Sequence, residues 1–192
     1  MPYTKEHKNR SRDRIIASAI TLFSSRGFDN VTLDAVMAHA GMTRGAFYNH
    51  FNSKQDLYAE AMNTAALQSP MASDAPKGVE LVEHLQCLVE NYLSKAHLQD
   101  AINPCLMAFM VTDVANQEPE VRKTYTRIFK GFSKRLTEMM DGDDTHHKQH
   151  AQALAALMIG GVAVCRTFTD AKLVDEVLAA CRQLAATVIE VD

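Results

Sequence analysis

The sequence predicts an all-α fold in which an N-terminal three-helix helix-turn-helix module precedes a larger C-terminal helical domain. Apolar residues recur at helical spacing through most of the 192 residues, and runs of alternating polarity that would indicate a sheet are not seen in the sequence. Capping residues and glycines divide the N-terminal third into short helices. Since 47% of the residues are apolar, the chain is able to bury a substantial core.

The first two helices are delimited by glycine and threonine. The first is expected to end at Gly27, because glycine readily adopts the left-handed conformation of a helix C-terminus. Thr32 is expected to cap the second, with apolar residues just before it and four residues after it, and Gly41 marks its end. One face of the first helix is apolar and is expected to face the core: Ile15, Ile16, Ala19, Leu22 and Phe23.

A third helix, capped by Thr43, is expected over residues 43–51, and with the second it forms a helix-turn-helix. If Phe47 and Phe51 point inward, the outward face is small and polar, because successive residues turn by about 100°. Such a face fits a DNA major groove, where Arg44 in the first turn reaches guanine acceptors and Asn49 matches an adenine edge. The small outward residues are Gly45, Ala46 and Asn49.

Three side chains flank this face, where the phosphates of a duplex would run: Tyr48, His50 and Lys54. The helix N-termini at Thr32 and Thr43 add backbone N–H groups, which bind phosphates without reading sequence. The alternative for Tyr48 and His50 is packing at the edge of the core, since amphipathic rings often lie half buried.

Positive charge is concentrated near the N-terminus. Residues 1–58 contain eight Lys/Arg and five Asp/Glu, a net charge of +3, while the rest of the chain carries −6, which gives the overall charge of −3. A basic run in the first helix is suited to phosphates, although a solvated helix start explains it as well. Its members are Lys5, Lys8, Arg10, Arg12 and Arg14.

Membrane and secreted classes are not favoured by the sequence. No apolar run approaches the roughly 18 residues that span a bilayer, and the start of the chain lacks the apolar core of a signal peptide. We therefore expect a cytoplasmic protein. The four cysteines stand singly, so free thiols are expected and a disulfide framework is not. They are Cys87, Cys105, Cys165 and Cys181.

The rest of the chain is expected to form amphipathic helices after a break at residues 70–76, where two prolines interrupt the helical pattern. The last two helices carry long apolar stripes over residues 154–168 and 174–188. Gly160 and Gly161, in the first of these stripes, would allow helices to approach closely.

Residues 41–57 read Gly-Met-Thr-Arg-Gly-Ala-Phe-Tyr-Asn-His-Phe-Asn-Ser-Lys-Gln-Asp-Leu and closely resemble the signature of the TetR family of repressors. The resemblance extends over residues 10–62. We therefore expect a helix-turn-helix DNA-binding domain over residues 1–52 and an effector-binding and dimerisation domain over residues 53–192. The resemblance implies that Arg44, Gly45, Ala46 and Asn49 face bases, while Thr32, Thr43, Tyr48, His50 and Lys54 hold the DNA backbone.

The resemblance also implies a ligand- or stress-responsive regulator, usually a repressor that an inducer releases from a palindromic operator. Two half-sites require a homodimer, because one recognition helix spans too few base pairs for operator selectivity. The family dimerises through its last two helices, although packing within one chain explains the same stripes. The residues expected at that interface are Leu157, Gly161, Val164, Phe168, Val177, Cys181 and Leu184.

An inducer pocket is implied in the middle helices. Ordinary core packing explains its expected lining equally well, although methionine suits an adaptable apolar cavity. The expected lining residues are Met107, Phe109, Met110, Tyr125, Phe129 and Phe132.

Cys105 is a candidate sensor. Asn103 as cap and Pro104 as first helical residue would place the thiol in the first turn, where the helix dipole lowers its pKa. A cysteine here is similar to one in a subgroup of the family that senses electrophiles or oxidants, although the surrounding residues differ. A buried, inert thiol is the alternative.

Two other classes of protein, an enzyme and a helical adaptor, fit the sequence less well. Enzyme motifs such as Gly-x-Ser-x-Gly, the phosphate-binding loop and His-Glu-x-x-His are not found in the sequence, so neither an enzyme nor a cofactor is expected. A helical adaptor would explain the apolar stripes but not the small-faced third helix. His146 and His150 suit a metal together with Asp143 or Asp144, but a solvated surface explains them too, and no metal is expected.

Overall fold

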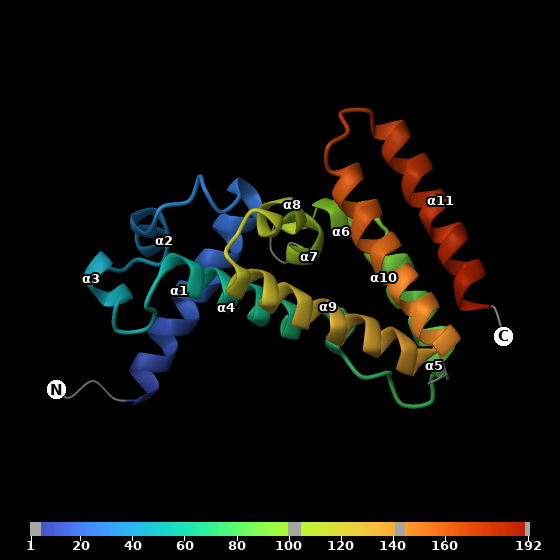
Figure 1. The fold of residues 1–192 in the computed structure, drawn as a ribbon, viewed down its shortest axis with the longest axis horizontal. Coiled ribbons are helices and arrows are strands. Elements are labelled where there is room, and N and C mark those ends of the chain that lie inside the picture. The colour runs from blue at the N-terminus through green and yellow to red at the C-terminus, as the bar shows by residue number, and fades with distance from the viewer. Residues whose placement is uncertain (1–4, 100–104, 141–144, 191–192) are drawn as a thin grey trace.

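The computed structural model describes residues 5–99, 105–140 and 145–190, and every regular element in those ranges is a helix. This confirms the all-α prediction. Helices α1 to α3 form one end of the molecule, and α5, α10 and α11 form the other (Figure 1). Between them α4 and α9 lie side by side along the long axis. None of the described helices is long and apolar enough to cross a membrane.

The N-terminal helices begin and end close to the predicted positions. They are α1 (Lys5–Arg26), α2 (Leu33–His39), α3 (Arg44–Phe47) and α4 (Lys54–Gln68). Gly27 and Gly41 follow α1 and α2 with φ angles of 75° and 66°, the left-handed conformation expected of them. Oγ1 of Thr32 accepts a hydrogen bond from the N–H of Ala35 at 3.1 Å, which confirms Thr32 as an N-cap.

The prolines of residues 70–76 end the long helix α4 as predicted, with a short 3-10 helix, η1 (Pro70–Ala72), in the connection. Of the later helices, only four have more than five residues. The described elements that follow are α5 (Leu81–Tyr92), α6 (Lys95–Gln99), α7 (Leu106–Phe109), α8 (Val111–Ala115), α9 (Pro119–Met139), α10 (Thr145–Cys165) and α11 (Ala171–Ile189).

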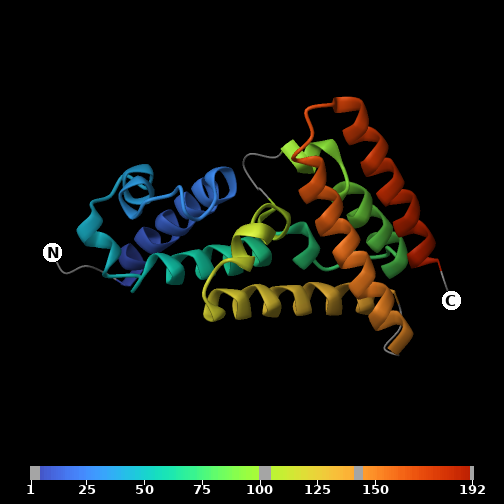
Figure 2. The ribbon, with the colours of Figure 1, turned by 45° about the horizontal axis from the view of Figure 1, so that its top comes forward.

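Two hydrophobic cores lie along the molecule. Figure 2 shows the ribbon of the helices that contribute to them. The first joins Phe23 and Phe47 to Leu57 and Tyr58 of α4, and it also takes in residues from much later in the chain, namely Leu106, Met110, Val114 and Val121. The second lies among α5, α9, α10 and α11 and contains Leu85, Leu136, Leu154 and Leu178. The helix-turn-helix therefore packs on a surface that the later helices help to build.

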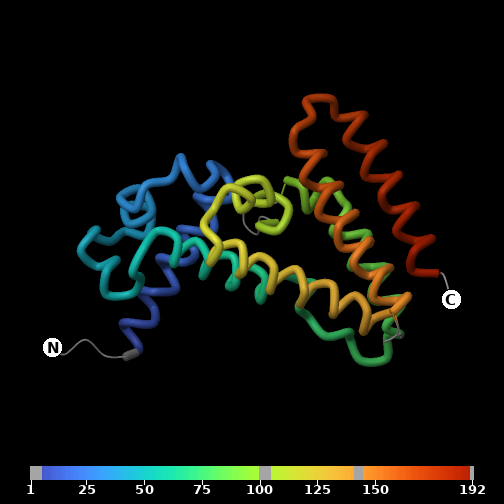
Figure 3. Tube along the Cα trace, in the orientation of Figure 1, coloured from blue at the N-terminus to red at the C-terminus, as the bar shows by residue number. Residues whose placement is uncertain are grey.

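Helices α7 and α8 bring the chain back against the end of α1 (Figure 3). The N–H of Phe28 donates a 2.8 Å hydrogen bond to Oδ2 of Asp113 on α8. Nη2 of Arg166 donates to the carbonyl oxygen of Ser24 at 2.7 Å. The Arg166 guanidinium also lies 3.9 Å from the ring centroid of Phe109 on α7. These contacts fix the turn after α1 to the C-terminal helices.

We expect the substitution Gly27→Ala to lower the free energy of unfolding by about 1–3 kcal/mol. A non-glycine residue in the left-handed region costs roughly 1–2 kcal/mol, and a Cβ here would lie 2.8 Å from Oδ2 of Asp113. Urea denaturation followed by circular dichroism measures the change. The control is Gly131→Ala on α9, where a Cβ meets no atom within 4 Å and the helix gains roughly 0.5–1 kcal/mol. An unchanged midpoint for Gly27→Ala would contradict the assigned geometry.

Candidate nucleic-acid interface and ligand cavity

The face of α3 is arranged as the sequence predicts. Phe47 and Phe51 are buried, with 0% and 3% of their surface exposed. Tyr48 is 60% exposed, although it is a large aromatic residue. The other residues of this face are exposed or half-buried, namely Thr43, Arg44, Gly45, Ala46 and Asn49. The core aromatics therefore hold the polar face of the helix toward solvent.

The α-helical part of α3 is shorter than the predicted span of residues 43–51. It ends at Phe47, and the helical path continues as turns, with the N–H of His50 and of Phe51 both bonding to the carbonyl oxygen of Phe47. In the described structure Thr43 makes no side-chain capping hydrogen bond. The physical reason is that a four-residue helix containing Gly45 has little intrinsic stability, so packing of the aromatic residues holds it.

Arg44 forms an ion pair with α2 across the helix-turn-helix. Its Nη1 lies 2.8 Å from Oδ2 of Asp34, and both side chains are exposed. A hydrogen bond with the hydroxyl of Tyr48 and the charge of Asp34 raise the pKa of Arg44, which therefore stays protonated. The guanidinium carries five N–H donors, and Asp34 and Tyr48 hold it beside the exposed face.

A cleft of about 790 Å³ lies between α3 and the start of α1. Its walls include Lys8 of α1 together with Thr43, Asn49 and His50. Burial first, and then the charges of Lys8 and Arg12, lower the pKa of His50, so its imidazole is neutral at pH 7. Lys8 and the α3 face together present positive charge and hydrogen-bonding groups to the same space.

The basic run of α1 is divided between intramolecular partners and solvent. Nη2 of Arg14 donates to the carbonyl oxygen of Ala40 at 2.6 Å, which satisfies the C-terminus of α2. Arg12 pairs with Glu60 of α4 at 3.0 Å, and Arg10 pairs with Glu6 at 2.7 Å. Arg14 is thus a structural residue, because its guanidinium is occupied inside the module.

Lys54 follows the N-cap of α4, where Oγ of Ser53 accepts from the N–H of Asp56 at 3.0 Å. Its Nζ lies 4.0 Å from the ring centroid of Phe28, and burial lowers the pKa of Lys54. The cation–π contact holds the amine at the edge of the module, beside the turn that Asp113 fixes.

A cavity of about 1150 Å³ lies among α1, α4, α9 and the connection after α4. Of the residues predicted to line an inducer pocket, Met107 and Phe132 line this cavity, and so does the candidate sensor Cys105. Phe109, Met110, Tyr125 and Phe129 lie outside its lining. Met110 is fully buried in the first core, and the hydroxyl of Tyr125 donates to the carbonyl oxygen of Met107 at 2.8 Å.

The sequence analysis missed most of the cavity wall. Apolar side chains of α1 and α4 line it, as do two arginines of α9. Arg127, Gly131 and Arg135 are spaced four residues apart, which places them on one helix face. This spacing is the feature of the sequence that could have predicted the α9 wall. The lining residues of α9 were predicted from its apolar stripe alone.

The low pKa predicted for Cys105 is wrong. Cys105 is the N-cap of α7 rather than a first-turn residue, and it is 8% exposed. Burial raises the pKa of its thiol and outweighs the hydrogen bond with the hydroxyl of Tyr92, whose oxygen lies 2.9 Å from Sγ. Asn103 and Pro104, on which the prediction relied, lie outside the described residues.

The residues predicted to form the dimer interface divide into three groups. Val164 and Leu184 are 49% and 54% exposed, so they are free of the core. Gly161 instead faces inward, since a Cβ on it would lie 3.0 Å from Sγ of Cys181 and 3.3 Å from Leu93. Its role is the close approach of α10 to α11 and α5 within one chain. The others are half-buried against the second core: Leu157, Phe168, Val177 and Cys181.

The rings of His146 and His150 lie 4.0 Å apart between centroids. Asp143 and Asp144, their suggested partners, lie outside the described residues. Within the ranges that the structure describes, no group of three or more His, Cys, Asp or Glu side chains is placed to hold a metal ion.

Residues 15–61 match the family model described as "Bacterial regulatory proteins, tetR family". The uncharacterized HTH-type transcriptional regulator YfiR of Bacillus subtilis is 27% identical over 168 residues, covering 80% of this chain and 76% of YfiR. The uncharacterized HTH-type transcriptional regulator TtgW of Pseudomonas putida is 31% identical over 94 residues, covering 49% of this chain and 69% of TtgW.

A third relative is IcaR of Staphylococcus aureus, a negative transcriptional regulator of the biofilm operon icaADBC. It is 39% identical over 51 residues, which cover 27% of each chain. Among solved structures, a TetR family regulator from Cytophaga hutchinsonii superposes with a TM-score of 0.76 at 17% identity, covering 96% of this chain and 98% of that one. The shared fold thus extends over nearly the whole chain.

We expect Cys87, which is exposed, to be alkylated at least about tenfold faster than Cys105 in the native protein at pH 8. Cys105 is buried, and its raised pKa keeps the thiol protonated, whereas the thiolate is the reacting form. Labelling with iodoacetamide followed by peptide mass spectrometry measures both rates in one sample, and the same reaction in urea is the control. Equal native rates would contradict the burial of Cys105.

Proposed function

The chain belongs to the TetR family of helix-turn-helix DNA-binding transcriptional regulators, and we propose that it is a repressor that a small molecule releases from a palindromic operator. The relatives are regulators of transcription and not enzymes, so the enzymatic alternative is excluded. The repressor assignment is supported by IcaR, a negative regulator. The observation that carries the proposal is the exposed, small-residue face of α3.

Operator binding is assigned to α3 in the major groove. Gly45 and Ala46 let the helix approach the base edges, and Arg44 and Asn49 offer the donors that recognise guanine and adenine. The backbone contacts are assigned to the exposed or half-buried residues around this face, namely Thr32, Thr43, Tyr48, His50 and Lys54. The neutral His50 donates a hydrogen bond and carries no charge in this assignment.

The homodimer is assigned to α10 and α11. Three of the large apolar residues exposed in the described structure lie on or beside these helices: Val164, Leu173 and Leu184. Gly160 of α10 has open space beside it, since a Cβ there meets no atom within 4 Å. Exposed apolar residues gathered on neighbouring helices are typical of an interface. A dimer places two copies of α3 on successive half-sites.

Effector response is assigned to the 1150 Å³ cavity, because its walls belong to both parts of the molecule. Ile16 and Ile20 come from α1, while Met62 comes from α4 and also lies in the core under the helix-turn-helix. A ligand that moves these walls moves α3 with them. We retain the division into residues 1–52 and 53–192: the first segment carries the base-reading helix α3, and the second carries the proposed dimer helices and most of the effector cavity, while α1 completes the cavity wall and Lys54 adds a DNA-backbone contact.

We expect selection from a random duplex library to enrich a palindrome that the full chain binds as a dimer. Replacing Tyr48→Ala and Lys54→Ala together should weaken binding by roughly a hundredfold, because two charge-assisted or polar backbone contacts are lost. Fluorescence anisotropy across a salt series measures this, and the log–log salt slope should fall by about one for the lost lysine. The control is Lys123→Ala on α9, which pairs with Glu120. Undiminished binding by the double variant would refute the interface.

The double substitution Val164→Glu and Leu184→Glu should dissociate the dimer, because buried unpaired carboxylates are costly at an apolar interface. Sedimentation equilibrium should then give the 21.3 kDa of one chain instead of twice that mass. Leu81→Glu, at a 44% exposed leucine on α5, is the matched control and should leave the mass unchanged. A dimer that survives the double substitution would place the interface elsewhere.

A further inference from the structure

We propose that the cavity binds an amphipathic organic anion, with its acidic group between Arg127 and Arg135 and its apolar body against the walls of α1 and α4. This inference rests on the proposed function, since it names the class of effector for that cavity. The walls combine an apolar interior with guanidinium groups on α9.

Three of the cavity residues of α9 form a recognition strip. Arg127, Gly131 and Arg135 follow at intervals of four residues, so they share one face of the helix. A Cβ at Gly131 would meet no atom within 4 Å, so the strip has open space between its two arginines. Arg127 and Gly131 are exposed, which places the mouth of the cavity along this part of α9.

The charge of Arg127 is not neutralised inside the protein. Its Nη2 donates to Oδ1 of Asn63 on α4 at 3.1 Å, and none of the described carboxylates forms an ion pair with it. An arginine carries five N–H donors in a fixed fork, and a single amide oxygen satisfies only one of them. The remaining donors suit the oxygen atoms of a carboxylate, sulfate or phosphate.

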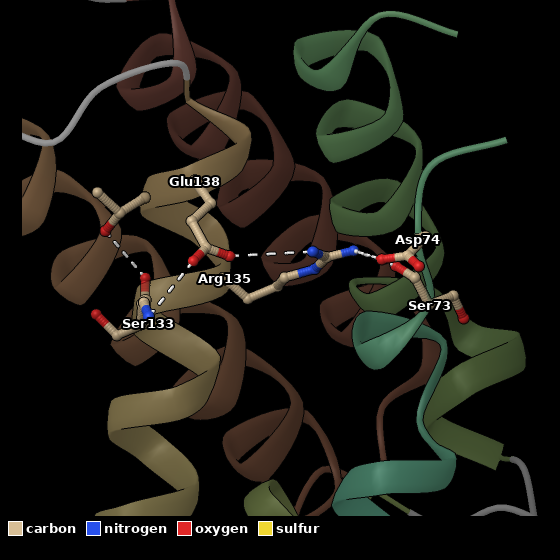
Figure 4. Close-up of polar contacts among 7 residues, drawn as sticks. Ser73, Asp74, Ser133, Arg135 and Glu138 are labelled. Carbon is tan, nitrogen blue, oxygen red and sulfur yellow. Dashed lines mark hydrogen bonds and ion pairs between the residues drawn. The ribbon is translucent and has the colours of Figure 1, made fainter. Parts of the chain in front are cut away.

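Arg135 holds the wall at the far end of the strip (Figure 4). Its Nη2 donates to the carbonyl oxygen of Ser73 at 2.6 Å and lies 3.0 Å from Oδ1 of Asp74, so it ties the connection after α4 to α9. Glu138 lies 3.9 Å from its Nη1. Its Nε is buried and makes no hydrogen bond within the described structure. That donor has no partner within the described residues, and Arg135 lines the cavity.

The opposite walls favour an apolar body. Ile16 and Ile20 of α1, Met62 of α4 and Phe132 of α9 line the interior. Two carboxylates also line the cavity, Asp13 and Glu60, but they lie on the walls of α1 and α4, and Glu60 already pairs with Arg12 at 3.0 Å. The lining thus holds three arginines against two carboxylates, and Arg127 lies on a different helix from both carboxylates. The arrangement therefore favours an anion.

The test compares octanoate with octanamide, which has the same apolar body and no charge. Isothermal titration calorimetry on the full chain without DNA should give at least about tenfold tighter binding of octanoate, the value of one charge-assisted contact. Arg127→Gln should remove that preference, and Gly131→Leu should abolish binding by filling the strip. Arg122→Gln, at an exposed arginine of α9 outside the cavity lining, should bind octanoate as the native chain does and is the charge control.

Three results would each overturn the proposal. The first is equal binding of octanoate and octanamide, and the second is no binding of octanoate. The third is octanoate binding that is unchanged in both Arg127→Gln and Gly131→Leu. Operator release is measured separately by anisotropy. Release by octanamide as readily as by octanoate would overturn the anion assignment and leave the ligand-responsive regulator standing. Tight octanoate binding by a chain that binds no duplex would support the cavity assignment and refute only the proposed regulator.

Discussion

The structure depends on the packing of α4 between α1 on one side and α9 on the other. The ring of Tyr58 on α4 lies 4.9 Å from the rings of both Phe23 and Phe28, each in an edge-on arrangement. These aromatic contacts bury large apolar areas and fix the angle at which α1 and the following turn meet α4. Because the next turns of α4 line the cavity, the same helix carries the recognition module and the effector wall.

Arginine has three different roles here, and burial and partners separate them. Arg14 and Arg166 donate to backbone carbonyl oxygens and so hold the α2 terminus and the α1 terminus in place. Arg44 is exposed and paired with a carboxylate at the edge of the DNA-facing surface. Arg127 is exposed beside a neutral amide at the mouth of the cavity. A sequence shows all four as equal positive charges, whereas their partners decide which of them is available to a ligand.

Local signals of the sequence predicted the helix-turn-helix because its geometry is set within a few residues. Left-handed glycines such as Gly27 and the cap at Thr32 obey short-range backbone sterics and hydrogen bonding, and the inward direction of Phe47 and Phe51 follows from helical periodicity. The prediction was weaker where distant segments meet. The lowered pKa predicted for Cys105 is wrong, because burial beside Tyr92 outweighs the local pattern. Gly161, predicted at the dimer interface, lies against Cys181 of the same chain.

The sequence by itself determined the all-helical class, the ends of the first two helices and the face of α3 that points outward, since each depends on contacts between residues near in the chain. Only the tertiary structure decided which residues surround the cavity and how the module is anchored. The hydrogen bond from Phe28 to Asp113 spans 85 residues, and the one from Arg166 to Ser24 spans 142. Periodicity indicates which face of a helix carries apolar or charged side chains. Only the packing of distant helices determines what each side chain contacts.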